Sequence, residues 1–223
     1  MLCSSAGNDL MFDDSLCEQG RNFGNKIWNA YKLVCGWSVD AAREQSECNR
    51  LSIEWFEQRL AAAQMQIEKD FAAYRISDAL LVAYRLFWDE FSGWLLEMVK
   101  PAYGDSIDEC TLKAVKSIFE RLMQMLHPFM PFLTEEIWQD IAERAEGESI
   151  CVSAAKVAEE ADEKLLARFE LAKEVISAVR NVRKQKNLPN KDALTLKVIV
   201  DENYPSEYEA VITKMANLTE VER

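Results

Sequence analysis

Five side chains near the N-terminus have the types and the spacing that suit contact with single-stranded RNA. A helix turns by about 100° per residue, so all five fall on one side of a helix through this region. Cationic groups in such a set meet phosphates, amide side chains bond base edges or sugar hydroxyls, and an aromatic ring stacks on a base, with about 1–3 kcal/mol per stacked base. The five residues are Arg21, Asn25, Trp28, Asn29 and Lys32.

The segment that carries this face, residues 20–31, contains three asparagines and two glycines. An interior asparagine costs a few tenths of a kcal/mol and a glycine about 1 kcal/mol relative to alanine, so a face that only met water would be more stable with Glu, Lys and Ala. Two explanations stay open: contact with RNA, or asparagines that cap or bridge neighbouring helices. Tyr31 is a second stacking candidate, whereas Asn22 and Lys26 lie nearer the apolar side and are expected to pack.

A second group of cations lies between residues 173 and 191, where six basic residues stand against the single acid Glu174. Arg180, Arg183 and Lys184 are the candidates for gripping an RNA backbone. The alternative is a solvated helix end, because the helix dipole favours cations at its C-terminus. Both readings stay open.

No residue set predicts catalysis, a cofactor or a metal. The cysteines have irregular spacing without a Cys-x-x-Cys pair, so we expect reduced thiols in a cytoplasm rather than a zinc site or disulfides. The one histidine, His127, lies in a proline-rich turn and is expected to be structural. The adjacent pairs Asp89–Glu90 and Glu135–Glu136 diverge by about 100° on a helix, so neither shares one face. The cysteines are Cys3, Cys17, Cys35, Cys48, Cys110 and Cys151.

The composition fits one large globular domain, or a domain with a small appendage. The chain has 223 residues, of which 49% are hydrophobic and 29% charged, and only 7 glycines and 5 prolines, which favours long helices. Its formal net charge of −12 argues against a general nucleic-acid binder, so an RNA contact should be local. No apolar stretch approaches the about 18 residues of a membrane span.

Apolar residues at three- and four-residue spacing predict a mostly helical chain. Residues 151–161 are small, acidic and aperiodic and read as a linker, and residues 194–200 alternate like a strand. The predicted helices cover about 14–35, 52–74, 78–100, 106–126, 134–144, 162–187 and 205–217. We expect Pro128 and Pro131 to stop the fourth helix before Thr134 starts the fifth, and the tryptophans at 55, 88, 94 and 138 to be core.

The strand at 194–200 needs a partner, because a lone strand is not stable. We expect it to pair with a segment such as 150–153, or to begin a subdomain that continues beyond Arg223. The predicted organisation is a helical bundle over 1–150, with 1–13 as a joint, then the linker 151–161 and a C-terminal appendage over 162–223 of one strand and helices, which is expected to be truncated.

Three stretches resemble the anticodon-binding domain of valyl-tRNA synthetases, which are class I enzymes. The isoleucyl and leucyl enzymes share this helical domain and carry looser versions of the third stretch, whereas the first two read as valyl. The stretches follow the family's order. They are Arg-Asn-Phe-Gly-Asn-Lys-Ile-Trp-Asn-Ala at 21–30, Trp-Asp-Glu-Phe at 88–91 with Trp94 and Lys100-Pro101, and His-Pro-Phe-Met-Pro-Phe-Leu-Thr-Glu-Glu-Ile-Trp at 127–138.

The resemblance implies an all-α anticodon-binding helix bundle with a small α+β appendage. The implied task is to recognise and position the anticodon stem-loop of valine tRNA as part of a valine–tRNA ligase, with no DNA or membrane partner. ATP and valine would be handled by a catalytic domain, to which residues 1–13 would lead. That domain's His-Ile-Gly-His-like and Lys-Met-Ser-Lys-Ser-like motifs are not in this sequence, so the fragment alone is not expected to aminoacylate. The alternatives are the anticodon-binding domain of the related isoleucyl or leucyl enzyme and, from another class, a non-enzymatic helical protein-interaction scaffold.

Overall fold

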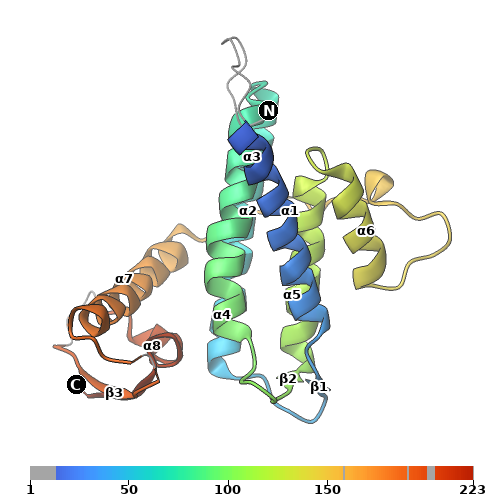
Figure 1. Cartoon of the computed structure of the whole chain (residues 1–223). Helices are drawn as coiled ribbons and strands as arrows, with labels where there is room; N and C mark the ends of the chain where they lie inside the picture. Colours follow the sequence, from blue (N-terminus) through green and yellow to red (C-terminus); the bar gives the residue numbers. More distant parts are fainter. Residues whose placement is uncertain (1–13, 158, 190, 200–203, 223) are drawn as a thin grey trace.

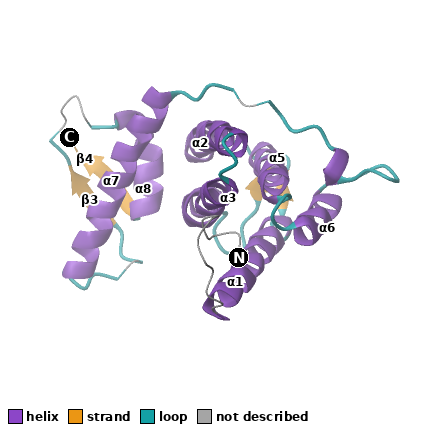
Figure 2. Ribbon diagram, turned by 90° about the horizontal axis from the view of Figure 1, so that it is seen from above, coloured by secondary structure: helices purple, strands orange, loops and turns teal. Residues whose placement is uncertain are grey.

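The computed structural model describes residues 14–157, 159–189, 191–199 and 204–222. The long helices are α1 Asp14–Cys35, α2 Glu47–Ala72, α3 Ile76–Arg85, α5 Glu109–Leu126, α6 Pro131–Ile141 and α7 Glu163–Gln185, with the shorter α4 Leu96–Val99 and α8 Glu209–Ala216. α1, α2, α3 and α5 stand side by side as a bundle, α6 flanks α5, and α7 and α8 lie on the other side of α2 (Figures 1 and 2). The predicted all-α bundle with a small appendage is confirmed.

Two helices begin earlier than predicted, because the residues that start them were not recognised in the sequence. α2 starts at Glu47 rather than near Ser52, since the Ser46 side chain accepts a hydrogen bond from the Asn49 backbone N–H and caps the helix. α6 starts at Pro131 rather than Thr134. Proline lacks only an N–H that the first helical turn leaves unpaired, so Pro131 begins this helix instead of ending the previous one.

The predicted third helix is continuous from Ile76 to Val99, but its middle is a π-helix, η1, over Leu86–Leu95. A contact with α2 holds this π-helix: Arg59 donates to both carboxylate oxygens of Glu90 at 2.6 Å. π-helical turns are rare and occur often at functional sites. The sequence pattern gave no sign of this turn.

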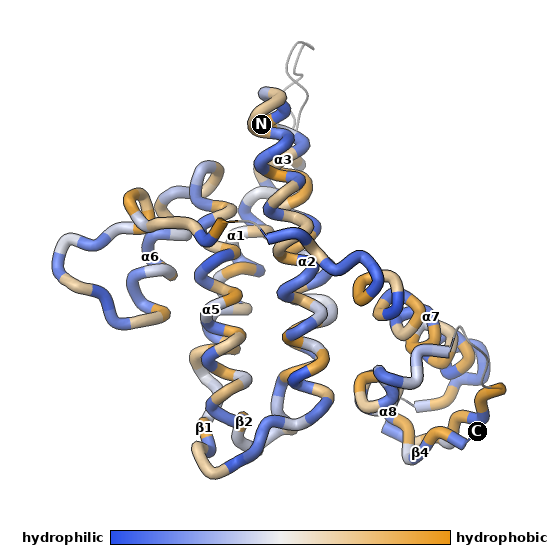
Figure 3. The backbone as a smooth tube through the Cα atoms, turned by 180° about the vertical axis from the view of Figure 1, so that it is seen from behind, coloured by the Kyte–Doolittle hydropathy of each residue, from blue (hydrophilic) through white to orange (hydrophobic). Residues whose placement is uncertain are grey.

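The core of the bundle is a cluster of phenylalanines that joins α2, η1 and α5. Phe91 contacts Phe56, Phe87 and Phe119 with ring-centroid distances of 5.7, 5.2 and 5.3 Å, and all four rings are fully buried. Apolar and polar stretches alternate along these helices, as a buried stripe requires (Figure 3).

Two of the four tryptophans predicted as core are not in it. Trp55 and Trp138 are buried, but Trp88 and Trp94 are only half-buried at its edge. Their rings are covered by cations: Lys26 Nζ lies 4.4 Å from the Trp88 ring, and Lys173 Nζ lies 5.3 Å from the Trp94 ring. A cation over an aromatic face covers apolar surface without full burial, which helical spacing alone does not reveal.

Strand pairing differs from the prediction. β3 Leu194–Lys197 pairs in parallel with β4 Leu218–Glu222 and not with 150–153, and Val200 lies outside the described residues. A second parallel pair, β1 Val39–Asp40 with β2 Ile107–Asp108, was also missed. Each strand of that pair has two residues, too few for a sequence pattern.

The appendage packs on the bundle through aromatic stacking. The Trp55 ring of α2 lies 4.4 Å from the Phe169 ring of α7 at an interplanar angle of 9°, and Tyr208 meets Phe169 edge-on. The predicted linker falls between α7 and a short 3-10 helix, η2 Ile150–Val152, which overlaps its first residues. Within the part of the chain that the structure describes, no helix combines the length and apolar character needed to cross a membrane.

Candidate nucleic-acid interface

α1 buries one stripe and exposes the other, as the sequence pattern predicted. The buried stripe is Phe23, Ile27, Ala30, Tyr31 and Val34. On the opposite side Arg21, Asn25, Asn29 and Lys32 are exposed, and Trp28 is half-buried. The five candidate residues therefore share one accessible face of α1, which we call the α1 face.

The α1 face is positioned by contacts with η1 and α3. The Phe23 ring packs 4.6 Å from Tyr84 and 6.2 Å from Trp88, which is also the ring that Lys26 covers. Lys26 thus packs as expected, whereas Asn22, also expected to pack, is exposed. These contacts fix the rotation of α1 about its axis, and with it the direction in which the polar side chains point.

Tyr31 is not available to stack on a base, although the sequence made it a second stacking candidate. Its side chain is buried, and its hydroxyl donates a hydrogen bond to Asp140 of α6. Burial raises the pKa of Tyr31 above its ordinary value, and the hydrogen bond to the Asp140 carboxylate raises it further. Tyr31 instead supports Trp28, since the two ring centroids are 5.4 Å apart.

Trp28 is the aromatic side chain of the α1 face that keeps accessible surface. It packs partly against the core, and Lys32 Nζ lies 5.6 Å from its ring centroid. A base that stacked on the covered part of the ring would displace this ammonium group, which is free to turn toward a phosphate because Lys side chains are flexible.

Arg183 was predicted to contact RNA, and the structure shows that this is wrong. Its side chain is 3% exposed, and its guanidinium donates to four backbone carbonyls at 2.7–3.1 Å. The acceptors are the carbonyls of Pro189, Asp192, Ala216 and Asn217. A guanidinium with these partners holds the end of α8 to the loop after α7 and cannot reach a phosphate.

The other two cations of this group remain on the surface. Lys184 is exposed, and Arg180 is exposed although it donates to the Met215 carbonyl at 3.2 Å and lies 5.4 Å from the Trp94 ring. α2 and α3 stand between α1 and α7 (Figures 1 and 2). The structure therefore separates Arg180 and Lys184 from the α1 face.

The sequence interpretation missed a cationic cavity at the opposite end of the bundle from the start of α1. This cavity of about 460 Å³ is lined by Arg43, Lys100, Arg180 and Lys214, with acids such as Asp105 among them. Burial lowers the pKa of Lys214, and Arg43 pairs with Asp105 at 2.9 Å. These residues come from four distant segments, so no local pattern could have grouped them.

Comparison with known proteins identifies the family. A family model described as the anticodon-binding domain of tRNA ligase matches residues 54–200, a segment that begins after α1. The chain is 48% identical over 223 residues to a valine–tRNA ligase of Parabacteroides distasonis and 50% identical over 222 residues to one of Phocaeicola vulgatus, each covering 100% of this chain and 25% of the relative. A more distant valine–tRNA ligase, from Fusobacterium nucleatum, is 33% identical over 98% of this chain and 26% of its own length.

These alignments include α1 as well as the matched bundle. The chain spans about a quarter of the length of the curated relatives it matches. The bundle architecture, the resemblance of its three motifs and the matched family model agree, and the chain belongs to the family of anticodon-binding domains of tRNA ligases.

Proposed function

We propose that this chain is the anticodon-binding part of a valine–tRNA ligase and that it holds the anticodon stem-loop of valine tRNA. The relatives described above carry the valine–tRNA ligase name and align over essentially this whole chain. ATP-dependent attachment of valine would take place in a catalytic domain of the parent protein, and no residue of this chain is assigned a catalytic role. We place this task in the cytoplasm, where the free thiols would stay reduced.

The observation that carries the proposal is the exposed α1 face. Arg21 and Lys32 supply charge for phosphates, Asn25 and Asn29 supply amide donors and acceptors for base edges, and Trp28 supplies a stacking surface. The four polar groups are not needed by the core, because α1 is anchored by its opposite stripe, and Trp28 keeps accessible surface beside its core contact. Unpaired anticodon bases present what this set recognises: open faces, polar edges and a flanking backbone.

Arg180 and Lys184 form a second, weaker part of the proposal. Being separated from the α1 face, they would meet a different part of the same tRNA, through its backbone. Arg183 is left out because it is buried. With a net charge of −12 the chain has little general attraction for RNA, so binding should rest on these local contacts and weaken as salt rises.

The test replaces residues of the α1 face in the full-length enzyme. Trp28→Ala should weaken tRNA binding by about 5- to 150-fold, the equivalent of about 1–3 kcal/mol of stacking, and Arg21→Ala should weaken it and reduce its salt dependence. Valine-dependent ATP–pyrophosphate exchange should stay unchanged, because that step needs no anticodon contact. Filter binding measures the tRNA affinity, and exchange kinetics measure the valine-dependent step.

The matched control is Lys197→Ala, which removes an exposed cation of β3 that pairs with Glu222. It should leave tRNA affinity unchanged. If both α1 variants bind tRNA with wild-type affinity, the α1 face is not the RNA interface. A protein-interaction scaffold would bind a valine anticodon stem-loop no better than a scrambled one, so that comparison separates the two classes.

A further inference from the structure

Three side chains of metal-binding type meet where α5 ends, α6 begins and η2 returns to them. His127 follows the last residue of α5, Glu135 lies in the first turns of α6, and Cys151 lies in η2. Their ligand atoms all lie within 4.8 Å of one another, and His127 Nε2 is 3.1 Å from the Cys151 sulfur. One nitrogen, one sulfur and one carboxylate oxygen thus converge from three separate segments.

The hydrogen bonds of Thr134 determine which nitrogen of His127 carries the proton. The Thr134 hydroxyl donates to the Met130 carbonyl at 2.9 Å, so its oxygen accepts from His127 Nδ1–H, which is 2.8 Å away. Nε2 therefore keeps its lone pair and directs it toward Cys151. A metal-ligating histidine is usually held in this way, with the second ring nitrogen donating to a fixed oxygen.

Glu135 is held by three hydrogen bonds and keeps capacity to coordinate a further partner. Gln139 and Ser149 each donate to it at 2.8 Å, and the Ile150 backbone N–H donates at 3.4 Å. A carboxylate offers about four acceptor positions, so one remains for a further partner.

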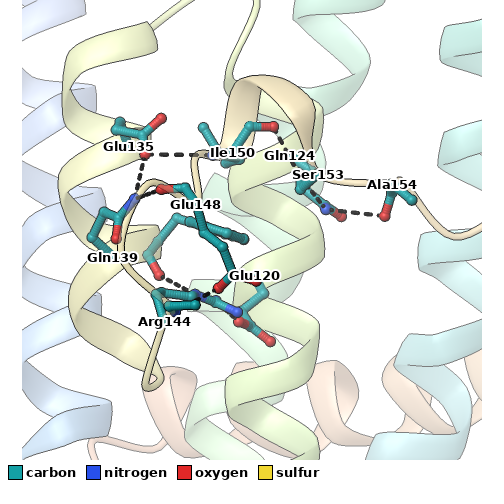
Figure 4. A network of polar contacts seen from close by, with 11 residues as sticks. Glu120, Gln124, Glu135, Gln139, Arg144, Glu148, Ile150, Ser153 and Ala154 are labelled. Atoms are coloured by element: carbon teal, nitrogen blue, oxygen red, sulfur yellow. Dashed lines mark hydrogen bonds and ion pairs between the residues drawn. The ribbon is translucent and has the colours of Figure 1, made fainter.

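The segment that carries Cys151 is fixed to the bundle on both sides. Gln139 donates to the Glu148 carbonyl at 2.5 Å, and Gln124 of α5 donates to the Ser153 hydroxyl at 2.9 Å. Figure 4 shows these contacts around Glu135 and Ile150. The three ligand groups are thus presented by a frame that is already formed, which lowers the ordering cost of binding.

We propose that His127, Glu135 and Cys151 bind a zinc-like divalent cation, with water as the fourth ligand. The combination of imidazole, thiolate and carboxylate is the set that Zn²⁺ takes, whereas Ca²⁺ and Mg²⁺ prefer oxygen ligands only. On binding, the Cys151 thiol gives its proton to solvent and the thiolate coordinates the metal. One thiolate and one carboxylate then balance the charge of the ion.

Binding requires the three side chains to adjust, because ligand atoms that lie within 4.8 Å of one another must reach the separations of about 3.3–3.6 Å found in a tetrahedral zinc site. Zinc–nitrogen and zinc–sulfur bonds in a tetrahedral site place the two ligand atoms about 3.6 Å apart, so the sulfur must move away from Nε2 by roughly 0.5 Å. Cys151 is exposed and free to do so. The bound ion would tie the end of α5 and the start of α6 to the segment that leads to α7.

Sequence spacing predicted no zinc site, because the cysteines lack zinc-ligand spacing. The three ligands are separated by intervals of 8 and 16 residues, which match no familiar motif. Only the return of the 145–152 segment onto the start of α6 brings them together.

The experiment is a titration of the intact, chelator-stripped chain with Co²⁺, which reports on its ligands spectroscopically. One equivalent should produce a thiolate-to-cobalt charge-transfer band, and Zn²⁺ should remove that band by competition. Cys151→Ser should abolish the band, while Cys110→Ser, which changes another exposed cysteine, should keep it. Zn²⁺ should raise the unfolding temperature of the wild type and of the Cys110 variant only.

The role of Thr134 gives a second, independent test. Thr134→Val removes the oxygen that holds Nδ1–H and should weaken metal affinity by about 10- to 100-fold, while Thr134→Ser should restore it. If the wild type shows no band at one equivalent, or if Cys151→Ser keeps the band, the three residues form only a hydrogen-bonded corner and the proposal fails.

Discussion

Arg183 is the residue whose role the tertiary structure changes most. Two of its four acceptors, the carbonyls of Ala216 and Asn217, lie at the C-terminal end of α8, where no intrahelical donor can reach them. The other two belong to the loop after α7. The cation therefore satisfies carbonyls of two segments at once, a task that needs a planar group with several fixed donors.

Replacing Arg183 should destabilise the fold rather than weaken RNA contact alone. Arg183→Met removes the guanidinium donors from all four carbonyls, although those of Pro189 and Asn217 also accept a backbone N–H. It should lower the free energy of unfolding by about 2–4 kcal/mol. Arg183→Lys should recover only part of this, because an ammonium group cannot span both acceptor pairs. Urea denaturation measures the change, and Lys184→Met is the control, with an expected effect within about 0.5 kcal/mol.

At the scale of the element, the packing of α1 does not require the two glycines in its sequence. A Cβ added at Gly20 would meet no atom within 4 Å, and one at Gly24 would meet Met130 and Leu133 at ordinary distances of 3.5 and 3.7 Å. Neither glycine is needed for close packing of the helix.

The same substitution should have opposite effects at two glycines of this chain. Gly20→Ala should stabilise the protein by about 1 kcal/mol, because alanine is the better helix former and has open space there. Gly104 also has open space, but its φ of +81° disfavours a side chain, so Gly104→Ala should destabilise by about 1 kcal/mol. Thermal unfolding of both variants provides the comparison, and equal signs would contradict the argument.

At the scale of the whole molecule, an aromatic contact anchors the appendage to the bundle. Phe169 of α7 is fully buried, stacked on Trp55 and met edge-on by Tyr208. The stacked pair joins elements more than a hundred residues apart in the chain. Together with the cations of α7 that cover Trp94, it couples the bundle to the α7–α8 unit.

Removing the Phe169 ring should weaken the whole fold and loosen the appendage first. Phe169→Ala should lower the free energy of unfolding by about 3–5 kcal/mol, since it leaves a cavity beside Trp55. Amide exchange should rise in α7 and α8 before it rises in α5. Phe132→Ala, at a ring that is 91% exposed, is the control and should change stability by less than about 0.5 kcal/mol.

The sequence by itself determined the helical elements, the rotation of α1 and the family. Apolar spacing is a local property, so it identified Phe23, Ile27 and Val34 as the buried stripe and left Arg21, Asn25 and Lys32 outside, as the structure shows. The three resembling motifs named the family that the comparison then confirmed. Each of these conclusions depends on residues close together in the chain.

The tertiary structure decided what distant segments do to one another. It buried Arg183 beneath the end of α8, paired β3 with β4, separated Lys184 from the α1 face, and brought His127, Glu135 and Cys151 to one corner. Periodicity shows which side of an element is apolar, but not which carbonyl or side chain will approach its polar side. That depends on how the elements pack, because a long cation or a thiol takes its role from groups that only folding brings within reach.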